Sequence, residues 1–274
     1  MGNICIIGPR GSGKTTYLAA LAYYPDRQRP GKKAKNIKLQ PLNDEATALA
    51  DKAENIILEG ASLAPTPITA TIDDLPFYYF GLEVKSPFQR TSSMINIAVR
   101  DYPGEIFEEL ANANSDSGIH KEFMNECLAE NVDGCLILLT DWSKGSDQFT
   151  SRVLARFTKL MDINGRADNL RIAIAMSKCE RGELWSGRLD PGLDLFQQHF
   201  PKTKTTLENV IPAKNLQFYA LSTFGVLSRN DPRPNRRNMI DSDNAVLREP
   251  EKWQPYGLIE PLYWLSKGKR LRYV

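Results

Sequence analysis

Apolar residues near the start of the chain are spaced as in a strand followed by two helices. Residues 3–7 form a short apolar run, which is typical of a buried strand. The apolar residues of 15–24 lie on one side of a helix, and those of 44–58 recur at spacings of three and four. Both segments are therefore predicted to be amphipathic helices.

Further along, the same pattern alternates strands with helices. Predicted strands cover residues 77–84, 94–100, 132–139, 170–176 and 216–221. Predicted helices cover residues 105–130 (broken near 112–118), 148–161, 193–199 and 256–266. This order predicts a three-layer α/β fold with helices on both faces of a mostly parallel six-stranded sheet. The runs at 77–84 and 94–100 form a hairpin and supply one antiparallel strand.

We expect residues 1–274 to form a single domain with additions to this framework. Residues 26–76 are an insertion that holds the extra helix and a proline-rich loop. Residues 228–252 are rich in Asn, Asp, Arg and Pro, which is typical of an irregular surface loop. Residues 253–274 contain the closing helix.

Composition excludes several classes of protein. The chain has 35 Lys and Arg against 33 Asp and Glu, a net charge of +2, so no nucleic-acid binding through bulk charge is expected. No apolar run reaches the length of a transmembrane helix, and no signal peptide is visible. The scattered cysteines form no CxxC pair and predict buried thiols in the reducing cytoplasm: Cys5, Cys127, Cys135 and Cys179.

A glycine-rich loop follows the first strand and matches G-x-x-x-x-G-K-[ST] from Gly8 to Thr15. Its backbone N–H groups and the start of the next helix suit phosphate oxygens. Lys14 supplies a positive charge, and the Thr15 hydroxyl is a ligand for Mg²⁺. The predicted nucleotide-binding residues here are Gly8, Arg10, Gly11, Ser12, Gly13, Lys14, Thr15 and Thr16.

A second candidate segment for nucleotide and metal binding follows the predicted strand at 94–100. Asp101 follows this strand, and Gly104 comes three residues later. An aspartate at the carboxyl end of a strand near a phosphate loop can hold Mg²⁺, and the glycine N–H can reach a γ-phosphate.

Two later segments complete a resemblance to a known family. Ser177-Lys178-Cys179-Glu180 follows the strand at 170–176, and Ser222-Thr223 ends the last strand. With the phosphate loop and Asp101–Gly104, they resemble the Ras-like and translation-factor-like P-loop GTPases. The closing segment looks like that of poorly characterised bacterial GTPase-like proteins. The resemblance implies binding of GTP and GDP with Mg²⁺, slow GTP hydrolysis, and signalling to a protein effector or regulator.

The sequence departs from this family at several positions. Glu180 stands where the family has aspartate to read guanine. Ser177 stands where the family has asparagine, so some of the hydrogen bonds that brace the loop are expected to be lost. Glu105 replaces the water-orienting glutamine. Arg10 replaces a glycine and is either solvated or an arginine finger, in cis or across a homodimer. Thr66, in preference to Thr69, is the candidate threonine of the first switch loop, reaching the metal or the γ-phosphate.

Two alternatives remain beside the GTP-binding switch. Glu180 and Ser177 leave room for an ATP-binding ATPase, whereas nothing resembles the arginine-rich lid of a nucleotide-dependent kinase. The other alternative is a non-hydrolysing module that holds nucleotide as a structural element, which is favoured if Glu105 and Arg10 both point away from the phosphates. The catalytic candidates are Lys14, Glu105 and Arg10.

Overall fold

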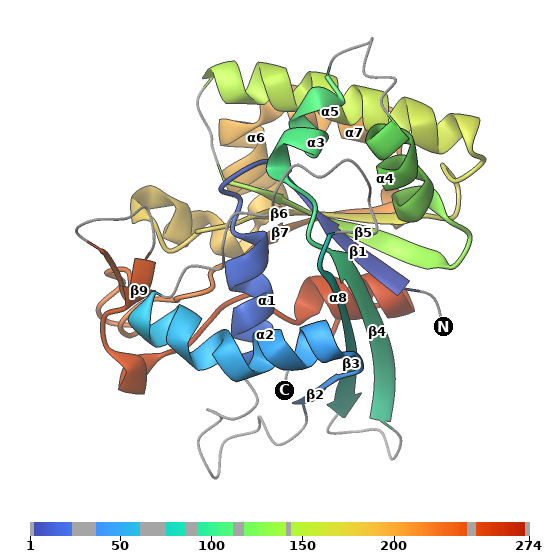
Figure 1. Cartoon of the computed structure of the whole chain (residues 1–274). Coiled ribbons are helices and arrows are strands. Elements are labelled where there is room, and N and C mark those ends of the chain that lie inside the picture. Colours follow the sequence, from blue (N-terminus) through green and yellow to red (C-terminus); the bar gives the residue numbers. More distant parts are fainter. Residues whose placement is uncertain are drawn as a thin grey trace.

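The structure of the chain is a computed structural model, and it describes residues 3–23, 37–60, 75–85, 92–111, 118–140, 144–239 and 245–271. Its elements fall into three layers, with a sheet between two groups of helices (Figure 1). The described part contains no helix that is long and apolar enough to cross a membrane.

The central sheet has seven strands in the order β2-β3-β4-β1-β5-β6-β7. They are β1 (Asn3–Ile7), β2 (Ile37–Pro41), β3 (Phe77–Lys85), β4 (Ser92–Arg100), β5 (Val132–Leu139), β6 (Arg171–Met176) and β7 (Leu216–Ala220). β3 pairs antiparallel with both β2 and β4, and the pairs from β4 through β1 to β7 are parallel. The expected antiparallel hairpin strand is β3, but the prediction of six strands is wrong because it omitted β2. β2 lies at the sheet edge and is largely exposed, so it lacks the apolar run of a buried strand.

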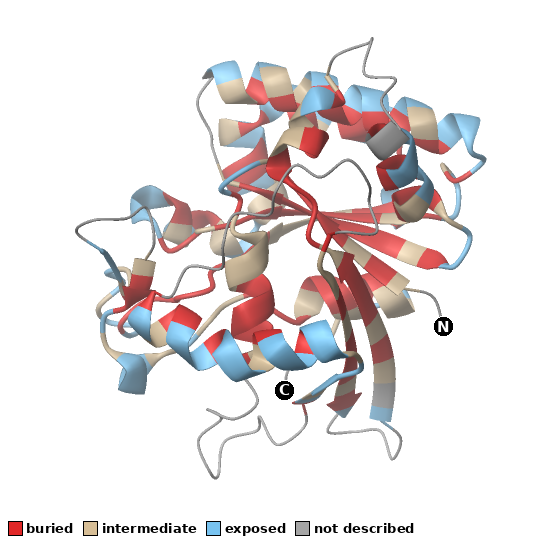
Figure 2. Ribbon diagram, viewed as in Figure 1, coloured by how far each residue is buried: buried red, intermediate tan, exposed pale blue. Residues whose placement is uncertain are grey.

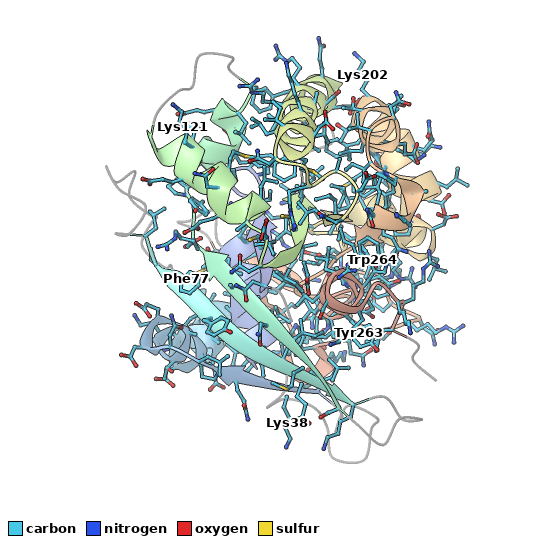
Figure 3. All side chains as sticks on the ribbon, turned by 90° about the vertical axis from the view of Figure 1, so that its right-hand side faces the viewer. Lys38, Phe77, Lys121, Lys202, Tyr263 and Trp264 are labelled. Atoms are coloured by element: carbon cyan, nitrogen blue, oxygen red, sulfur yellow. The ribbon has the colours of Figure 1, made fainter. Side chains whose placement is uncertain are left out.

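Helices cover both faces of the sheet, and each face has its own apolar core between the sheet and the helices (Figure 1, Figure 2). One face carries α1 (Lys14–Tyr23), α2 (Asp44–Glu54) and α8 (Glu260–Lys267). The other carries α3 (Gly104–Glu109), α4 (Gly118–Leu128), α5 (Lys144–Ile163), α6 (Gln197–His199) and α7 (Pro201–Glu208). In Figure 3, Trp264 of α8 lies among core side chains, whereas the exposed Lys38, Lys121 and Lys202 lie at the outer margin.

Shorter helical turns connect these elements. A π-helical turn (Asn55–Glu59) continues α2, and another (Pro191–Phe196) precedes α6. Turns of 3₁₀ type cover Gly182–Leu189, Ala213–Asn215 and Pro250–Lys252.

Residues 228–252 contain more regular structure than their composition predicts. β8 (Arg236–Asn238) and β9 (Ala245–Leu247) pair antiparallel as a separate two-stranded sheet. Each strand has three residues, too few to show an alternating pattern in the sequence. The pairing fixes Arg236 opposite Leu247 and so gives this segment a defined backbone.

Candidate nucleotide-binding site

The glycine-rich loop lies between β1 and α1, at the carboxyl end of the parallel strands. Gly8 has φ of +154°, and a Cβ there would overlap the carbonyl oxygen of Leu138 on β5, so the position requires glycine. The Ser12 N–H donates to Pro9 O at 3.2 Å, and the Tyr17 N–H donates to Gly13 O at 2.8 Å. The loop is therefore a closed turn that leads directly into the first turn of α1.

Lys14 folds back over this loop. Its Nζ donates to Gly8 O at 2.8 Å and to Pro9 O at 3.2 Å. Burial lowers the pKa of Lys14, and the nearby charges of Asp101, Glu105 and Glu108 oppose that shift. The ammonium group thus lies beside the loop and within the field of the segment that follows β4.

That segment contacts the loop directly through Gly104. A Cβ at Gly104 would overlap the backbone N and Cα of Arg10, so no larger residue fits this approach. Asp101 is buried at the end of β4, and its N–H donates to Pro76 O at 2.8 Å. The structure thereby places Gly104 against the loop, and Asp101 near enough for its charge to act on Lys14.

Two glutamates of α3 also contact the loop. The Arg10 guanidinium pairs with Glu105 at 3.4 Å, but the Arg10 side chain is 78% exposed, and such surface pairs contribute little to stability. The Arg10 N–H donates to Glu108 Oε1 at 3.0 Å. Sequence reasoning missed Glu108, although its i, i+3 spacing from Glu105 places both carboxylates on one face of α3.

The start of α3 is tied to α4 through Glu126. Its carboxylate accepts a hydrogen bond from the Tyr102 hydroxyl and one at 3.0 Å from Arg100 Nε. Burial and the neighbouring carboxylate raise the pKa of Tyr102, so the hydroxyl remains the donor. The residues on both sides of Asp101 are therefore fixed to the same helix.

The segment after β6 contacts the loop from its other side. Ser177 Oγ donates to Ser12 O at 2.8 Å, and Lys178 Nζ donates to Gly11 O at 2.8 Å. The serine hydroxyl therefore reaches the loop carbonyl itself, so at least part of the bracing is kept at Ser177. Lys178 has φ of +55°, an uncommon conformation for a residue other than glycine.

Glu180 lies two residues after Lys178 and is buried together with Ser222. The Ser222 hydroxyl donates to Glu180 Oε2 at 2.7 Å and accepts from the Gly225 N–H at 2.8 Å. Thr223 lies beside Ser222, and its carbonyl oxygen accepts from Trp253 Nε1 at 2.9 Å. The motifs after β6 and β7 are thus joined, as the order of the strands predicts.

Arg236 of β8 is a further neighbour of Glu180 that sequence reasoning did not single out. Its Nη1 lies 3.7 Å from Glu180 Oε1, and the two side chains are 12% and 1% exposed. Burial lowers the pKa of Arg236, and the Glu180 carboxylate opposes that shift. The only sequence signal was the basic stretch at 229–237, which is otherwise typical of a solvated loop.

The metal candidates are placed only in part. Thr15 lies in the first turn of α1, and Asp101 follows β4. A hydroxyl and a carboxylate are oxygen ligands that suit Mg²⁺, which takes its remaining ligands from phosphate and water. The described residues hold no group of three or more His, Cys, Asp or Glu able to bind a metal. Thr66 and Thr69 lie outside the described residues.

No protein-family model matches the chain, and no curated protein matches it. Among solved structures, the GTPase-like domain of S. cerevisiae Ski7 bound to GTP is 13% identical, with 84% of this chain and 45% of that chain covered and a TM-score of 0.38. The same domain bound to GDP and inorganic phosphate is 14% identical, with the same coverage and a TM-score of 0.39.

Sup35 complexed with GDP is 9% identical, with 88% of this chain and 40% of that chain covered and a TM-score of 0.31. This chain therefore spans less than half the length of these structures.

Proposed function

We propose that this protein binds GTP and GDP with Mg²⁺ and hydrolyses GTP slowly, as a switch that signals to a protein partner. The observation that carries the proposal is the convergence of separate segments on one loop. Gly104 packs on the loop backbone at Arg10, while Ser177 and Lys178 donate to the loop carbonyls of Ser12 and Gly11.

Each end of this arrangement has a chemical task. Lys14 and the loop N–H groups bind the phosphates, and Thr15 and Asp101 supply oxygen ligands for Mg²⁺, which would neutralise phosphate charge. Glu180 is buried, so guanine would reach its carboxylate only if neighbouring side chains move. Guanine N1–H and the 2-amino group would then donate to it, and adenine lacks donors at these positions. A γ-phosphate that binds near Gly104 would change its contact with Arg10, and α3 would carry that change to a partner surface.

Lys14→Ala tests the phosphate end. Loss of a charge-assisted contact costs about 1.5–3 kcal/mol, or about one to two decades in nucleotide affinity. Lys52→Ala, which changes an exposed lysine of α2, is the matched control and should bind as the wild type does. Titration with a fluorescent GTP analogue measures both. Wild-type affinity in a folded Lys14→Ala protein would contradict the assignment of the loop.

A non-hydrolysing module is the second candidate, and the exposed Arg10–Glu105 pair favours it. Single-turnover GTP hydrolysis separates the two candidates. The switch predicts a slow rate, well below ~1 s⁻¹, that Arg10→Ala lowers more than it weakens binding if the arginine acts on the transition state. A rate that also rises with protein concentration indicates action across a homodimer. No turnover at any protein concentration supports the non-hydrolysing module.

A further inference from the structure

The Glu180 carboxylate is closed off from solvent by the chain itself. Its side chain is 1% exposed, and one oxygen accepts from Ser222. The other oxygen, Oε1, has no hydrogen-bond partner among the described residues. Arg236 Nη1 lies 3.7 Å from it, within the range of an ion pair but beyond a good hydrogen bond. Oε1 therefore has an unused acceptor position that is itself buried, and its charge is partly offset by Arg236.

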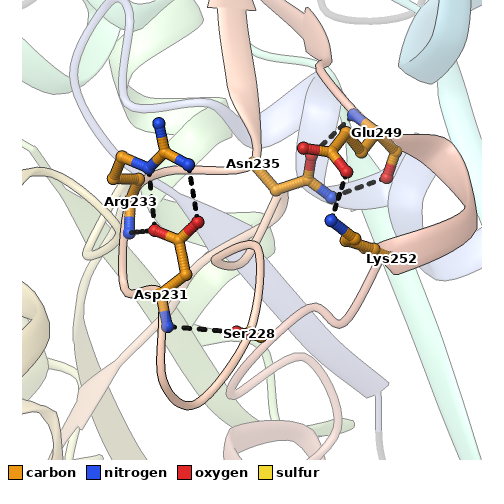
Figure 4. A network of polar contacts seen from close by, with 6 residues as sticks. All are labelled: Ser228, Asp231, Arg233, Asn235, Glu249 and Lys252. Carbon is orange, nitrogen blue, oxygen red and sulfur yellow. Dashed lines mark hydrogen bonds and ion pairs between the residues drawn. The ribbon is translucent and has the colours of Figure 1, made fainter.

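Arg236 is held at this place by the residues around it. The preceding Asn235 is fully buried, and its side chain makes two hydrogen bonds with the backbone of Glu249, at 2.8 and 2.9 Å (Figure 4). The backbone N–H of Asn235 donates to Gly225 O at 3.0 Å, and the N–H of Gly225 donates to the Ser222 hydroxyl. The strand that carries Arg236 is thus tied to the same loop that orients Glu180.

Charge pairs of the same segment lie farther out. Asp231 pairs with Arg233 at 2.7 Å, and Lys252 pairs with Glu249 (Figure 4). The side chain of Arg233 is 68% exposed and that of Lys252 48%, so water screens both pairs. Arg236 differs from these cations because its partner is a buried carboxylate.

We propose that Arg236 is a specificity-determining residue that acts through Glu180, by covering this carboxylate and limiting how strongly it distinguishes guanine from adenine. The inference rests on the proposed function, in which the nucleotide base lies at Glu180. A guanine can donate to Oε1 only where the guanidinium leaves room. While Arg236 stays in place, its positive charge also weakens the repulsion between the carboxylate and the lone pair on adenine N1.

Removing the guanidinium should therefore increase selectivity for guanine. Arg236→Met keeps an apolar side chain of similar length, and Arg237→Met is the matched control, because Arg237 is the exposed neighbour on the same strand. Titration with GTP and ATP gives the ratio of the two dissociation constants. We expect a rise in guanine preference of about tenfold in Arg236→Met, the effect of one charge-assisted hydrogen bond, and no change in Arg237→Met. An unchanged or smaller preference in folded Arg236→Met overturns the proposal.

Arg236→Met leaves a buried carboxylate without its counter-charge, which can lower the stability of the fold. The pair Glu180→Gln and Glu180→Gln/Arg236→Met removes that charge and completes a double-mutant cycle. We expect Glu180→Gln to reduce guanine preference more in the Arg236→Met background than in the wild type. Arg236→Lys keeps the positive charge, so its ratio of dissociation constants for GTP and ATP should stay near that of the wild type.

The cycle also separates this inference from the proposed function. If Glu180→Gln lowers guanine preference equally in both backgrounds, Glu180 reads the base independently of Arg236, and only the inference is wrong. If the folded wild type and the folded variants bind neither GTP nor ATP, the proposed function fails together with the inference.

Discussion

Gly104 is the residue at which the segment after β4 meets the glycine-rich loop. The atoms nearest to a Cβ added at Gly104 belong to the backbone of Arg10 and Pro9. Because no flexible side chain is involved, a rotamer change cannot make room for an added methyl group. The close approach brings Gly104 against the loop backbone at Pro9 and Arg10. A glycine at this position is therefore required by packing as well as by the proposed chemistry.

Gly104→Ala is expected to destabilise the protein by about 1–3 kcal/mol, as overpacking does. Gly145→Ala in α5 is the matched control, because nothing lies within 4 Å of the added Cβ. Alanine should leave stability there unchanged or raise it by about 0.5–1 kcal/mol. Chemical denaturation measures both changes. Equal stability of the two variants would show that the Gly104 contact is not maintained in solution.

Single residues also show the limit of sequence reasoning about the site. Lys14, Asp101 and Gly104 were predicted because each belongs to a short pattern at the end of a strand. Glu108 and Arg236 were not, because their partners, Arg10 and Glu180, lie far away in the sequence. Such contacts follow from tertiary packing, and a charged residue of this kind has the same local signature as a solvated one.

At the scale of elements, Asn43 connects the start of α2 to β3. Its Oδ1 accepts from the N–H groups of Ala46 and Tyr79, both at 3.1 Å, and its Nδ2 donates to Phe77 O at 2.6 Å. The residue therefore caps the helix and also satisfies the end of the neighbouring strand.

Asn43→Ala should lower the free energy of unfolding by about 1–3 kcal/mol, because it removes the cap and leaves the Tyr79 N–H without that acceptor. Asn43→Asp keeps both acceptor contacts and loses the donation to Phe77 O, so an intermediate loss is expected. Thermal unfolding of the three proteins gives the order. A wild-type melting temperature for Asn43→Ala would exclude this role.

Glu260 in the first turn of α8 gives a pH-dependent prediction. Burial raises the pKa of its carboxyl, although the Ile259 N–H donates to Oε2 at 3.2 Å. A folded-state pKa above the unfolded value means that stability falls as pH rises between the two, and the loss persists above them. Glu260→Gln should therefore raise the melting temperature at neutral pH and leave it unchanged below about pH 4, where both side chains are neutral. Equal melting temperatures at neutral pH would contradict this account.

The strength of the hydrophobic pattern decided which elements could be predicted. The buried strands β5 and β6 are nearly continuous apolar runs, and their predicted bounds agree closely with the structure. The edge strand β2 and the short α7 bury few residues and were missed. Partners and registers that depend on contacts across the fold, such as β8 with β9, have no local pattern to reveal them.

At the scale of the whole molecule, the segments that follow β1, β4, β6 and β7 all lie at the carboxyl end of the parallel strands. Parallel strands bring their carboxyl ends to the same side, so order in the sequence becomes proximity in space. This arrangement was predictable once the parallel strands were recognised. The charges inside the site could not be predicted from the sequence, because they depend on the contacts of Glu108 and Arg236.

We propose above all that the carboxyl end of the parallel strands binds a guanine nucleotide. Equilibrium titration of the full chain with GTP, GDP, ATP and ADP, with and without Mg²⁺, tests it most directly. The account predicts that GTP and GDP bind more tightly than ATP and ADP, and that Mg²⁺ strengthens binding of GTP. Binding of ATP at least as tight as that of GTP, or no binding of any of the four nucleotides, would contradict it.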